Sequence, residues 1–342
     1  MSFSKEKKQA IKDYLLTQIS TGNRNAILKT AEVFHTSRQT VYKYLHELEE
    51  NGAIHKEGKE IQVVSHIDQI HIPIEKGKTD EDRIFDENIM PLIKQYEDNV
   101  IHMWYFCFTE MMNNVIDHSE ASNCTIIVIR NPVYTEILLS DDGIGIFHKI
   151  TEHFHYPTPD DAIVELFKGK LTTDSQNHSG EGIFFTSRIM DVFAAISDGK
   201  LFSHSDYHEV KRDLDDIPQL KSLMPEKGTL IYMQLSNHSR KTNKDIMDTF
   251  ADQDKGFTRT RIPVKNLFNA FPVSRSQAKR LYNRLDSFET VELDFTGVEE
   301  IGQGFAHELF VVFQRNHPET RLIPYNVCFD VQRMINHVLS TR

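Results

Sequence analysis

The sequence predicts a multidomain α/β protein. At 342 residues the chain is longer than a single hydrophobic core usually supports. Apolar residues recur with helical spacing in some stretches and alternate as in strands in others. Polar, charged segments separate these stretches. We therefore expect domains at residues 1–64, 66–236 and 257–342, with residues 237–256 as a linker.

Composition argues against several classes of protein: general nucleic-acid binders, disulfide-rich proteins and membrane proteins. The net charge of −11 argues against a surface that binds nucleic acid throughout, although one small domain still could. The three cysteines, Cys107, Cys124 and Cys328, have no spacing that suggests a metal site or a disulfide. The first residues lack the apolar core of a signal peptide, and the longest apolar run, near 100–108, is too short to span a bilayer. We expect a cytoplasmic protein without a membrane segment.

The N-terminal segment predicts helices followed by a hairpin. Apolar residues recur with helical spacing in three stretches, and Ser37 can cap the third of them. Alternation around Glu57-Gly58 then predicts two short strands. The expected helices and hairpin cover Lys5–Ser20, Asn25–Phe34, Arg38–Glu50 and Ala53–Val64.

This order of elements resembles a winged helix-turn-helix domain. The resemblance implies that the helix from Arg38 enters the major groove of DNA, with Arg38, Gln39, Thr40 and Lys43 donating to bases or phosphates. Residues 1–60 hold ten basic and eight acidic side chains, a sign that suits DNA in a chain of net charge −11. A winged helix that binds protein or mediates homodimerisation is the alternative.

In the central segment, a polar stripe follows one face of a helix that ends at Ser119. Glu110, Asn113, Asn114, Asp117 and His118 share this face, which contains no Lys or Arg. A solvated helix face normally mixes both signs of charge. Carboxylate, amide and imidazole groups together can hold a hard cation and activate a hydroxyl group. A plain surface helix is the competing interpretation.

Three glycine-containing motifs follow in order. Asp141-Asp142-Gly143-Ile144-Gly145 comes directly after a predicted strand, where an aspartate can accept a hydrogen bond from an exocyclic amine and glycine lets the backbone approach a flat ring. Gly180-Glu181-Gly182 opens a helix, whose free N–H groups favour an anion. Gly228-Thr229 begins a closing strand. Each motif alone is a weak signal.

Together, the helix and these motifs resemble the Bergerat ATP-binding fold of the GHKL superfamily, an α/β two-layer sandwich. Over residues 66–236 the spacing is most similar to histidine kinase-like domains of the anti-sigma-factor kinase type. The resemblance implies ATP and Mg²⁺ as cofactors, with Phe147–Ser179 as a lid. It implies Glu110 as general base, Asn114 as Mg²⁺ ligand, and a nucleotide-binding set of Asn114, Asp141, Gly143, Gly145, Lys170, Gly180, Gly182 and Thr229.

The C-terminal segment predicts a small α/β domain. Strands are expected at Val291–Phe295 and Arg321–Tyr325, and helices at Ser274–Leu285, Phe305–Arg315 and Val327–Leu339. This pattern resembles a STAS-like domain. The resemblance implies an intramolecular contact with the ATPase domain, because such domains are partners in separate chains.

Three functions fit these observations. The first is a nucleotide-controlled transcriptional regulator, in which ATP binding changes how the domains pack and how the winged helix meets DNA. The second is a Ser/Thr protein kinase of the anti-sigma type that acts on a partner protein. The third is an ATP-dependent protein-interaction module that does not bind DNA.

Overall fold

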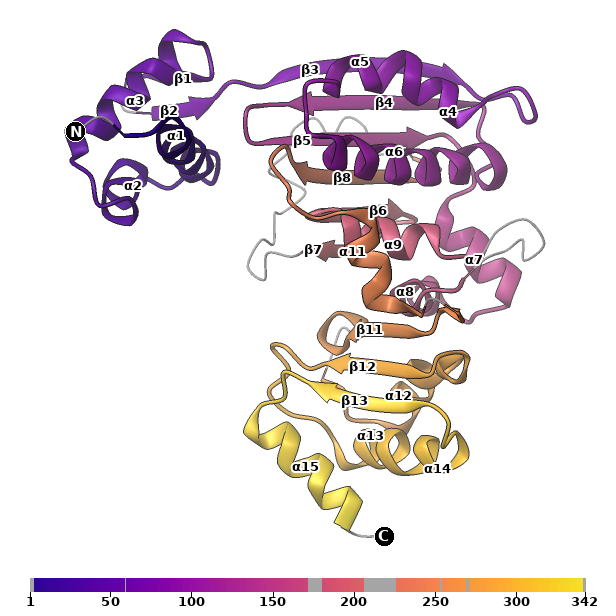
Figure 1. Ribbon diagram of the computed structural model, residues 1–342. Helices are drawn as coiled ribbons and strands as arrows, with labels where there is room; N and C mark the ends of the chain where they lie inside the picture. The colour runs from indigo at the N-terminus through magenta and orange to yellow at the C-terminus, as the bar shows by residue number, and fades with distance from the viewer. Residues whose placement is uncertain are drawn as a thin grey trace.

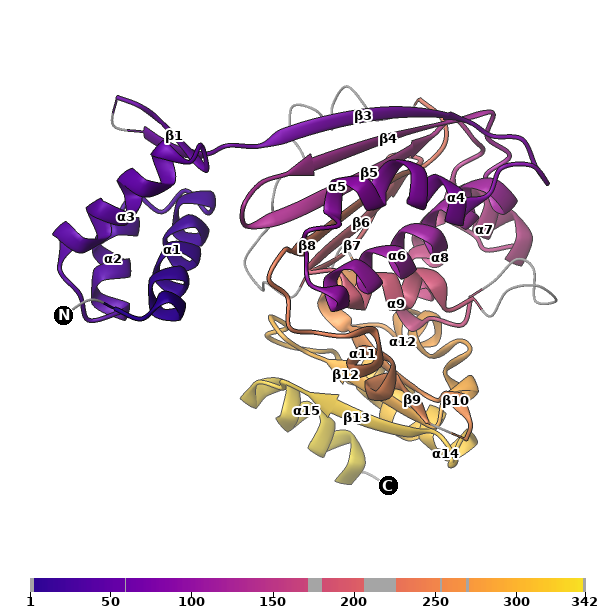
Figure 2. The same ribbon diagram turned by 45° about the horizontal axis from the view of Figure 1, so that its top comes forward.

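The computed structural model describes residues 3–58, 60–171, 180–205, 226–252, 254–268 and 271–340. It is a mixed α/β protein with several sheets, which confirms the predicted class at that level. Figures 1 and 2 show an N-terminal unit (residues 3–64) beside one end of a central unit (residues 66–236), with a C-terminal unit (residues 257–340) at the central unit's far edge. Within the described residues, no helix is long and apolar enough to cross a bilayer.

The N-terminal unit packs helices against a small hairpin. The predicted helix over Arg38–Glu50 is confirmed, and its cap is Ser37, whose Oγ accepts from the Thr40 N–H at 3.1 Å. The unit has its own core, which includes Leu15, Val41 and Leu45. Its elements are α1 (Lys5–Ser20), α2 (Ala26–Val33), α3 (Arg38–Glu50), β1 (Ile54–Glu57) and β2 (Glu60–Val63).

The central unit is built on an antiparallel sheet. Among the described residues this sheet has six strands in the order β3-β4-β5-β8-β6-β7. Its strands are β3 (His66–Pro73), β4 (Asn123–Arg130), β5 (Tyr134–Asp141), β6 (Val192–Ser197), β7 (Lys200–Ser205) and β8 (Leu230–Ser236). Its helical segments are α4 (Glu81–Ile84), η1 (Phe85–Ile89), α5 (Met90–Ile93), α6 (Asp98–Asn113), η2 (Asn114–His118), α7 (Ile146–Phe154), α8 (Pro159–Lys168) and α9 (Gly182–Ile189).

These helices lie on one face of the sheet (Figures 1 and 2). Strand residues alternate between faces, so Ile126, Ile137 and Leu139 join the core shared with α6 and α9. Ile127 and Leu138 belong to a second buried cluster on the other face. The helix-covered side positions the candidate site, because α6, α7 and α9 all present residues there.

The segment expected as a linker, residues 237–256, holds regular structure within its described residues. It contains a helix, α11 (Asn243–Phe250), and the short strands β9 (Ala251–Asp252) and β10 (Gly256–Phe257). Thr242 and Asp245 form a capping box that begins the helix. Ile246, Met247 and Phe250 follow at helical spacing and pack against the shared core. The exposed polar residues of α11 lie on its other faces: Lys244, Asp245, Asp248 and Thr249.

The C-terminal unit contains a parallel sheet. Within the described residues this sheet has three strands in the order β11-β12-β13. Its core is continuous with that of the central unit. Its elements are β11 (Arg259–Pro263), η4 (Val264–Leu267), α12 (Arg275–Tyr282), η5 (Leu285–Ser287), β12 (Thr290–Asp294), α13 (Gln303–His307), η6 (Glu308–Phe313), α14 (Gln314–Asn316), β13 (Arg321–Tyr325) and α15 (Phe329–Ser340).

Candidate functional site

A cavity of about 370 Å³ opens between the sheet and the helices of the central unit. Most of the predicted residues of the nucleotide site line it, although the first and the last are 119 residues apart in the chain. They are Glu110, Asn114, Asp141, Gly145, Gly180, Gly182 and Thr229. Apolar side chains such as Met111, Ile146 and Ile231 complete the lining. An apolar cleft with a few converging polar groups is the usual form of a small-molecule site.

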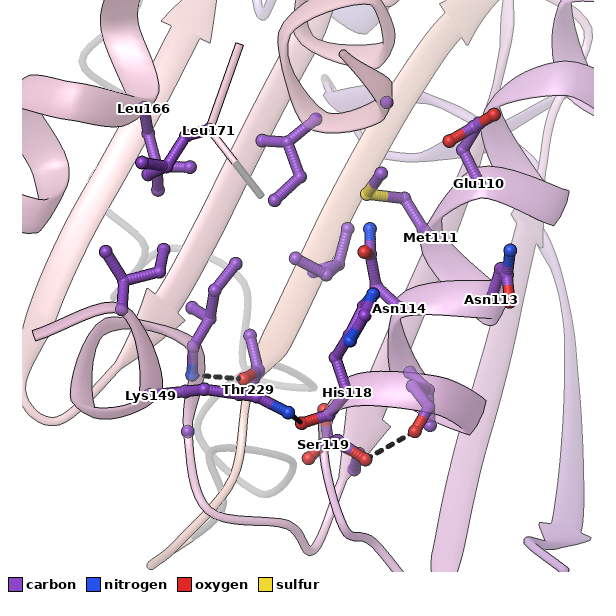
Figure 3. Close-up of a pocket in the computed structure, with 18 of the residues that line it drawn as sticks. Glu110, Met111, Asn113, Asn114, His118, Ser119, Lys149, Leu166, Leu171 and Thr229 are labelled. Carbon is purple, nitrogen blue, oxygen red and sulfur yellow. Dashed lines mark hydrogen bonds between the residues drawn. The ribbon is translucent and has the colours of Figure 1, made fainter. Parts of the chain in front are cut away.

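The polar stripe of α6 continues into a π-helical turn, η2, before the chain reverses. A turn of this kind shifts the register of the helix and is frequent at functional sites. Figure 3 shows Asn114 and His118 directed into the cavity, with Leu166 and Leu171 across from them. Asp117, on the predicted stripe, is not among the lining residues. The structure therefore brings an amide and an imidazole to the cavity from adjacent turns.

Asp141 supplies a buried acceptor at the end of β5. Its side chain is 4% exposed, and Oδ1 accepts a hydrogen bond from the Gly143 N–H at 2.9 Å. Burial raises the pKa of Asp141 to about 6. Gly143 does not line the cavity but supports this turn, since a Cβ at that position would lie 2.2 Å from the Ser119 carbonyl oxygen.

Thr229 connects the sheet to α7. Its Oγ1 accepts from the N–H of Ile146, the first residue of α7, at 3.0 Å. Gly145 precedes that residue with a φ of +86°, a conformation that favours glycine. Thr229 and Gly145 thus fix where α7 begins, and both line the cavity. Thr229 is labelled in Figure 3.

Glu110 lies against the start of α9. A Cβ on Gly182 would be 2.1 Å from Glu110 Oε2, so only glycine permits this approach. The amino end of a helix carries partial positive charge, which favours a nearby carboxylate. The sequence predicted that the N–H group of Gly182 faces an anion. In the structure, the carboxylate of Glu110 lies next to Gly182. Gly180, with a φ of +72°, packs against the backbone of Leu171.

Lys170, which the sequence predicted as a nucleotide-binding residue, is not among the residues that line the cavity. Its Nζ donates to the Ser287 carbonyl at 2.9 Å in the C-terminal unit and lies 4.6 Å from the Phe288 ring centroid. Lys168 is also directed to that unit. The interface offers both lysines carbonyl groups, which explains their orientation. Part of the predicted lid, residues 172–179, lies outside the described residues.

Lys149 lines the cavity although the sequence did not single it out. It projects from α7, and its Nζ donates to the His118 carbonyl oxygen across the cavity (Figure 3). Partial burial lowers the pKa of Lys149. Lys149 lies one helical turn after Gly145, which is the signal in the sequence that could have identified it. That signal can be used only if the start of α7 at Ile146 is known.

The predicted DNA-binding residues lie on α3. Arg38, Gln39 and Lys43 are exposed, whereas Thr40 is half-buried with its Oγ1 2.9 Å from Ser37 Oγ. Tyr42 is 57% exposed on the same helix. In the described part of the chain, no His, Cys, Asp and Glu side chains gather as a metal site.

Residues 277–329 match the family of a STAS-like domain of unknown function (DUF4325). No curated protein matches the chain. The matched segment runs from α12 to the first residue of α15 and contains β12 and β13. The C-terminal unit therefore contains a STAS-like domain, as the sequence predicted.

Proposed function

We propose that the chain is an ATP-binding, nucleotide-controlled regulator of transcription that acts in the cytoplasm. In this proposal the central unit is a GHKL ATPase domain with a Bergerat fold, and the N-terminal unit is a DNA-binding winged helix. The observation that carries the proposal is the convergence of Glu110, Asn114, Asp141 and the glycine motifs on one cavity. Sequence spacing alone did not require these segments to meet.

The donor set of the cavity suits a nucleotide. Asp141, a buried acceptor, would take the amino group of adenine, and Gly145 and Thr229 would shape the ring site. The Asn114 amide oxygen would hold Mg²⁺, a hard cation that prefers oxygen. Bound Mg²⁺ would neutralise phosphate charge. The N–H groups of Gly180 and Gly182 would face the phosphates, and Glu110 would polarise water or a hydroxyl group.

Binding is favoured over turnover as the main event. The Glu110 carboxylate contacts Gly182 at the start of α9, where it would repel a phosphate group. An incoming nucleotide would therefore have to displace Glu110 and move α9 relative to α6. Such a rearrangement suits a switch that other parts of the chain respond to.

Replacing Asn114 by alanine is expected to weaken Mg-ATP binding about tenfold or more, because the metal loses an oxygen ligand and the cavity loses a polar group. The dependence of ATP affinity on Mg²⁺ should be lost with it. Calorimetric titration with ATP, with and without Mg²⁺, measures both effects. Asn336→Ala, at an exposed position of α15, is the matched control. Unchanged Mg-ATP affinity in Asn114→Ala would refute the assignment.

Reversing the charges of Arg38 and Lys43 to glutamate is expected to abolish DNA binding. Lys43 is 73% exposed and only weakly paired with Glu47, at 4.0 Å, so both cations are available to phosphates. Anisotropy with a duplex selected on the wild-type protein from a random pool measures the loss. Lys78→Glu with Arg83→Glu, on the central unit, changes the net charge equally and should leave binding intact. A wild-type protein that shows no salt-dependent DNA binding would exclude the DNA-binding role.

A further inference from the structure

The chain after α7 has two sides with different neighbours. Leu166 and Leu171 line the cavity of the central unit (Figure 3). Glu165, Lys168 and Lys170, from the same stretch of sequence, bond to residues of the C-terminal unit. One short segment, residues 165–171, thus forms a wall of the cavity and an interface between units.

A buried ionic cluster holds this interface. Lys168 and Glu165 are 1% and 2% exposed and lie 2.5 Å apart, measured from Nζ to Oε1. Lys168 also donates to the carbonyl oxygens of Arg280 at 3.1 Å and Asn283 at 2.7 Å. Arg284 Nη1 donates to Glu165 Oε2 at 3.1 Å. Charges this deeply buried persist only where their hydrogen bonds are satisfied, so the cluster requires both units in place.

Arg284 bridges two points of the cavity wall. While Nη1 bonds Glu165 on α8, Nη2 donates to the carbonyl oxygen of Lys170, the residue before Leu171. The planar guanidinium group fixes both acceptors in one geometry, which a lysine ammonium cannot do. Gly169, between them, has a φ of +84°, and a Cβ there would lie 2.7 Å from a ring carbon of Phe257. The turn that carries Leu171 is therefore held by the C-terminal unit on two sides.

Aromatic contacts extend the interface to α9. Phe184 of α9 lies 4.6 Å from the ring centroid of Phe257, which lies 5.3 Å from Phe288. Arg188 of the same helix donates to the Arg261 carbonyl oxygen at 2.8 Å. Because α9 begins at Gly182, which lines the cavity, a second wall also rests on the C-terminal unit.

We propose that the corner formed by residues 280–287 is a docking surface for the cavity wall, and that Arg284 is a positioning residue that sets the ligand affinity of the cavity. The corner lies within the segment that matches the STAS-like family, so the proposal gives that domain a role in this chain. The choice of ATP as the ligand of the cavity rests on the proposed function. The docking of residues 280–287 against the cavity wall rests only on contacts between described residues.

Two measurements on the full chain test this inference. Arg284→Met and Arg284→Lys are compared with Arg333→Met, which alters an exposed ion pair on α15. Amide hydrogen exchange of residues 165–171, without ligand, should rise several-fold in both Arg284 variants and stay unchanged in Arg333→Met. The Kd for Mg-ATP should rise about tenfold in both, since neither methionine nor lysine bridges Glu165 and the Lys170 carbonyl.

A double variant, Arg284→Met with Glu165→Gln, should lose less affinity than the sum of the two single losses, because the two side chains share one contact. Wild-type exchange in Arg284→Met would overturn the inference. A wild-type Kd in Arg284→Lys would also overturn it, because the charge alone would then suffice. If the wild-type protein does not bind Mg-ATP, the proposed function fails, and the exchange measurement alone decides the positioning role.

Discussion

Asp141→Asn is expected to weaken Mg-ATP binding by about 100-fold or more, which corresponds to about 2.7 kcal/mol. The substitution keeps the shape of the side chain but replaces a charged acceptor with an amide. It removes a charge-assisted hydrogen bond to the adenine amino group, and in one amide orientation it sets donor against donor. Because Asp141 is buried, water cannot compensate for the loss. Calorimetric titration of the two proteins measures this difference.

The affinity lost in Asp141→Asn should depend on pH. Burial raises the pKa of Asp141 to about 6 in the free protein, so the carboxylate takes up a proton as the pH falls below that value. The protonated acid is a poorer acceptor, and wild-type affinity should decline toward that of the variant. The ratio of the two Kd values is therefore expected to be largest above pH 7 and to shrink toward pH 5. Comparing the two proteins cancels the ionisation of ATP itself.

Asp141→Asn should weaken ATP binding but should not lower the free energy of unfolding at neutral pH. A carboxyl group with a raised pKa in the folded state lowers stability as the pH rises through that pKa, because the unfolded chain ionises it more easily. Asp141→Asn should therefore be at least as stable as the wild-type protein at neutral pH. Asp142→Asn, an exposed neighbour, is the control and should bind Mg-ATP normally. Equal affinities of Asp141→Asn and wild type at pH 8 would contradict the assignment.

The fold was most predictable where local signals agree. The helix over Arg38–Glu50 has a serine cap, a regular apolar face and a following Asn-Gly, and its predicted bounds are those observed. A linker was expected at residues 237–256 because polarity outweighed the short apolar pattern of Ile246, Met247 and Phe250, which lie on helix α11. The hairpin of β6 and β7 was not anticipated, since its pairing with β8 is set by the sheet rather than by local sequence.

A site residue could be predicted where the local sequence alone determines the direction of its side chain. Asp141 and Asn114 each sit on an element whose period fixes their direction, and both line the cavity. Lys170 follows a glycine in a turn, and its direction is set by Ser287 and Phe288, more than a hundred residues later. Lys149 was missed because only the tertiary fold brings α7 opposite the end of α6.

Glu165→Gln is expected to destabilise the protein by about 3 kcal/mol at pH 7, because it removes the carboxylate that pairs with Lys168 and Arg284. Lys168→Met should cost much less, since Glu165 keeps Arg284 as a partner and methionine fills a similar volume. Unfolding in urea, followed by the fluorescence of the single tryptophan, Trp104, measures both. Trp104 is fully buried in the core that the two units share, so it reports on their joint unfolding.

The pH dependence of stability distinguishes the loss of the ion pair between Glu165 and Lys168 from a simple packing defect. Burial lowers the pKa of Lys168 to about 8, against the opposing attraction of Glu165. Between about pH 8 and the unfolded value near 10.4, the unfolded chain binds a proton that the folded chain does not, so this lysine makes stability rise with pH. Without Glu165 that pKa should fall further. The cost of Glu165→Gln should then shrink as the pH is raised toward 10, where Lys168 is neutral and needs no counter-ion.

Lys168→Met should remove this pH dependence, and adding it to Glu165→Gln should recover part of the lost stability, because one buried charge then disappears with its partner. A cavity or a packing error would instead cost the same at every pH and would add to the cost of Lys168→Met. Glu87→Gln, in the exposed pair with Arg83, should change stability by less than about 0.5 kcal/mol. An equally small effect of Glu165→Gln would mean that the ionic cluster does not hold the two units together.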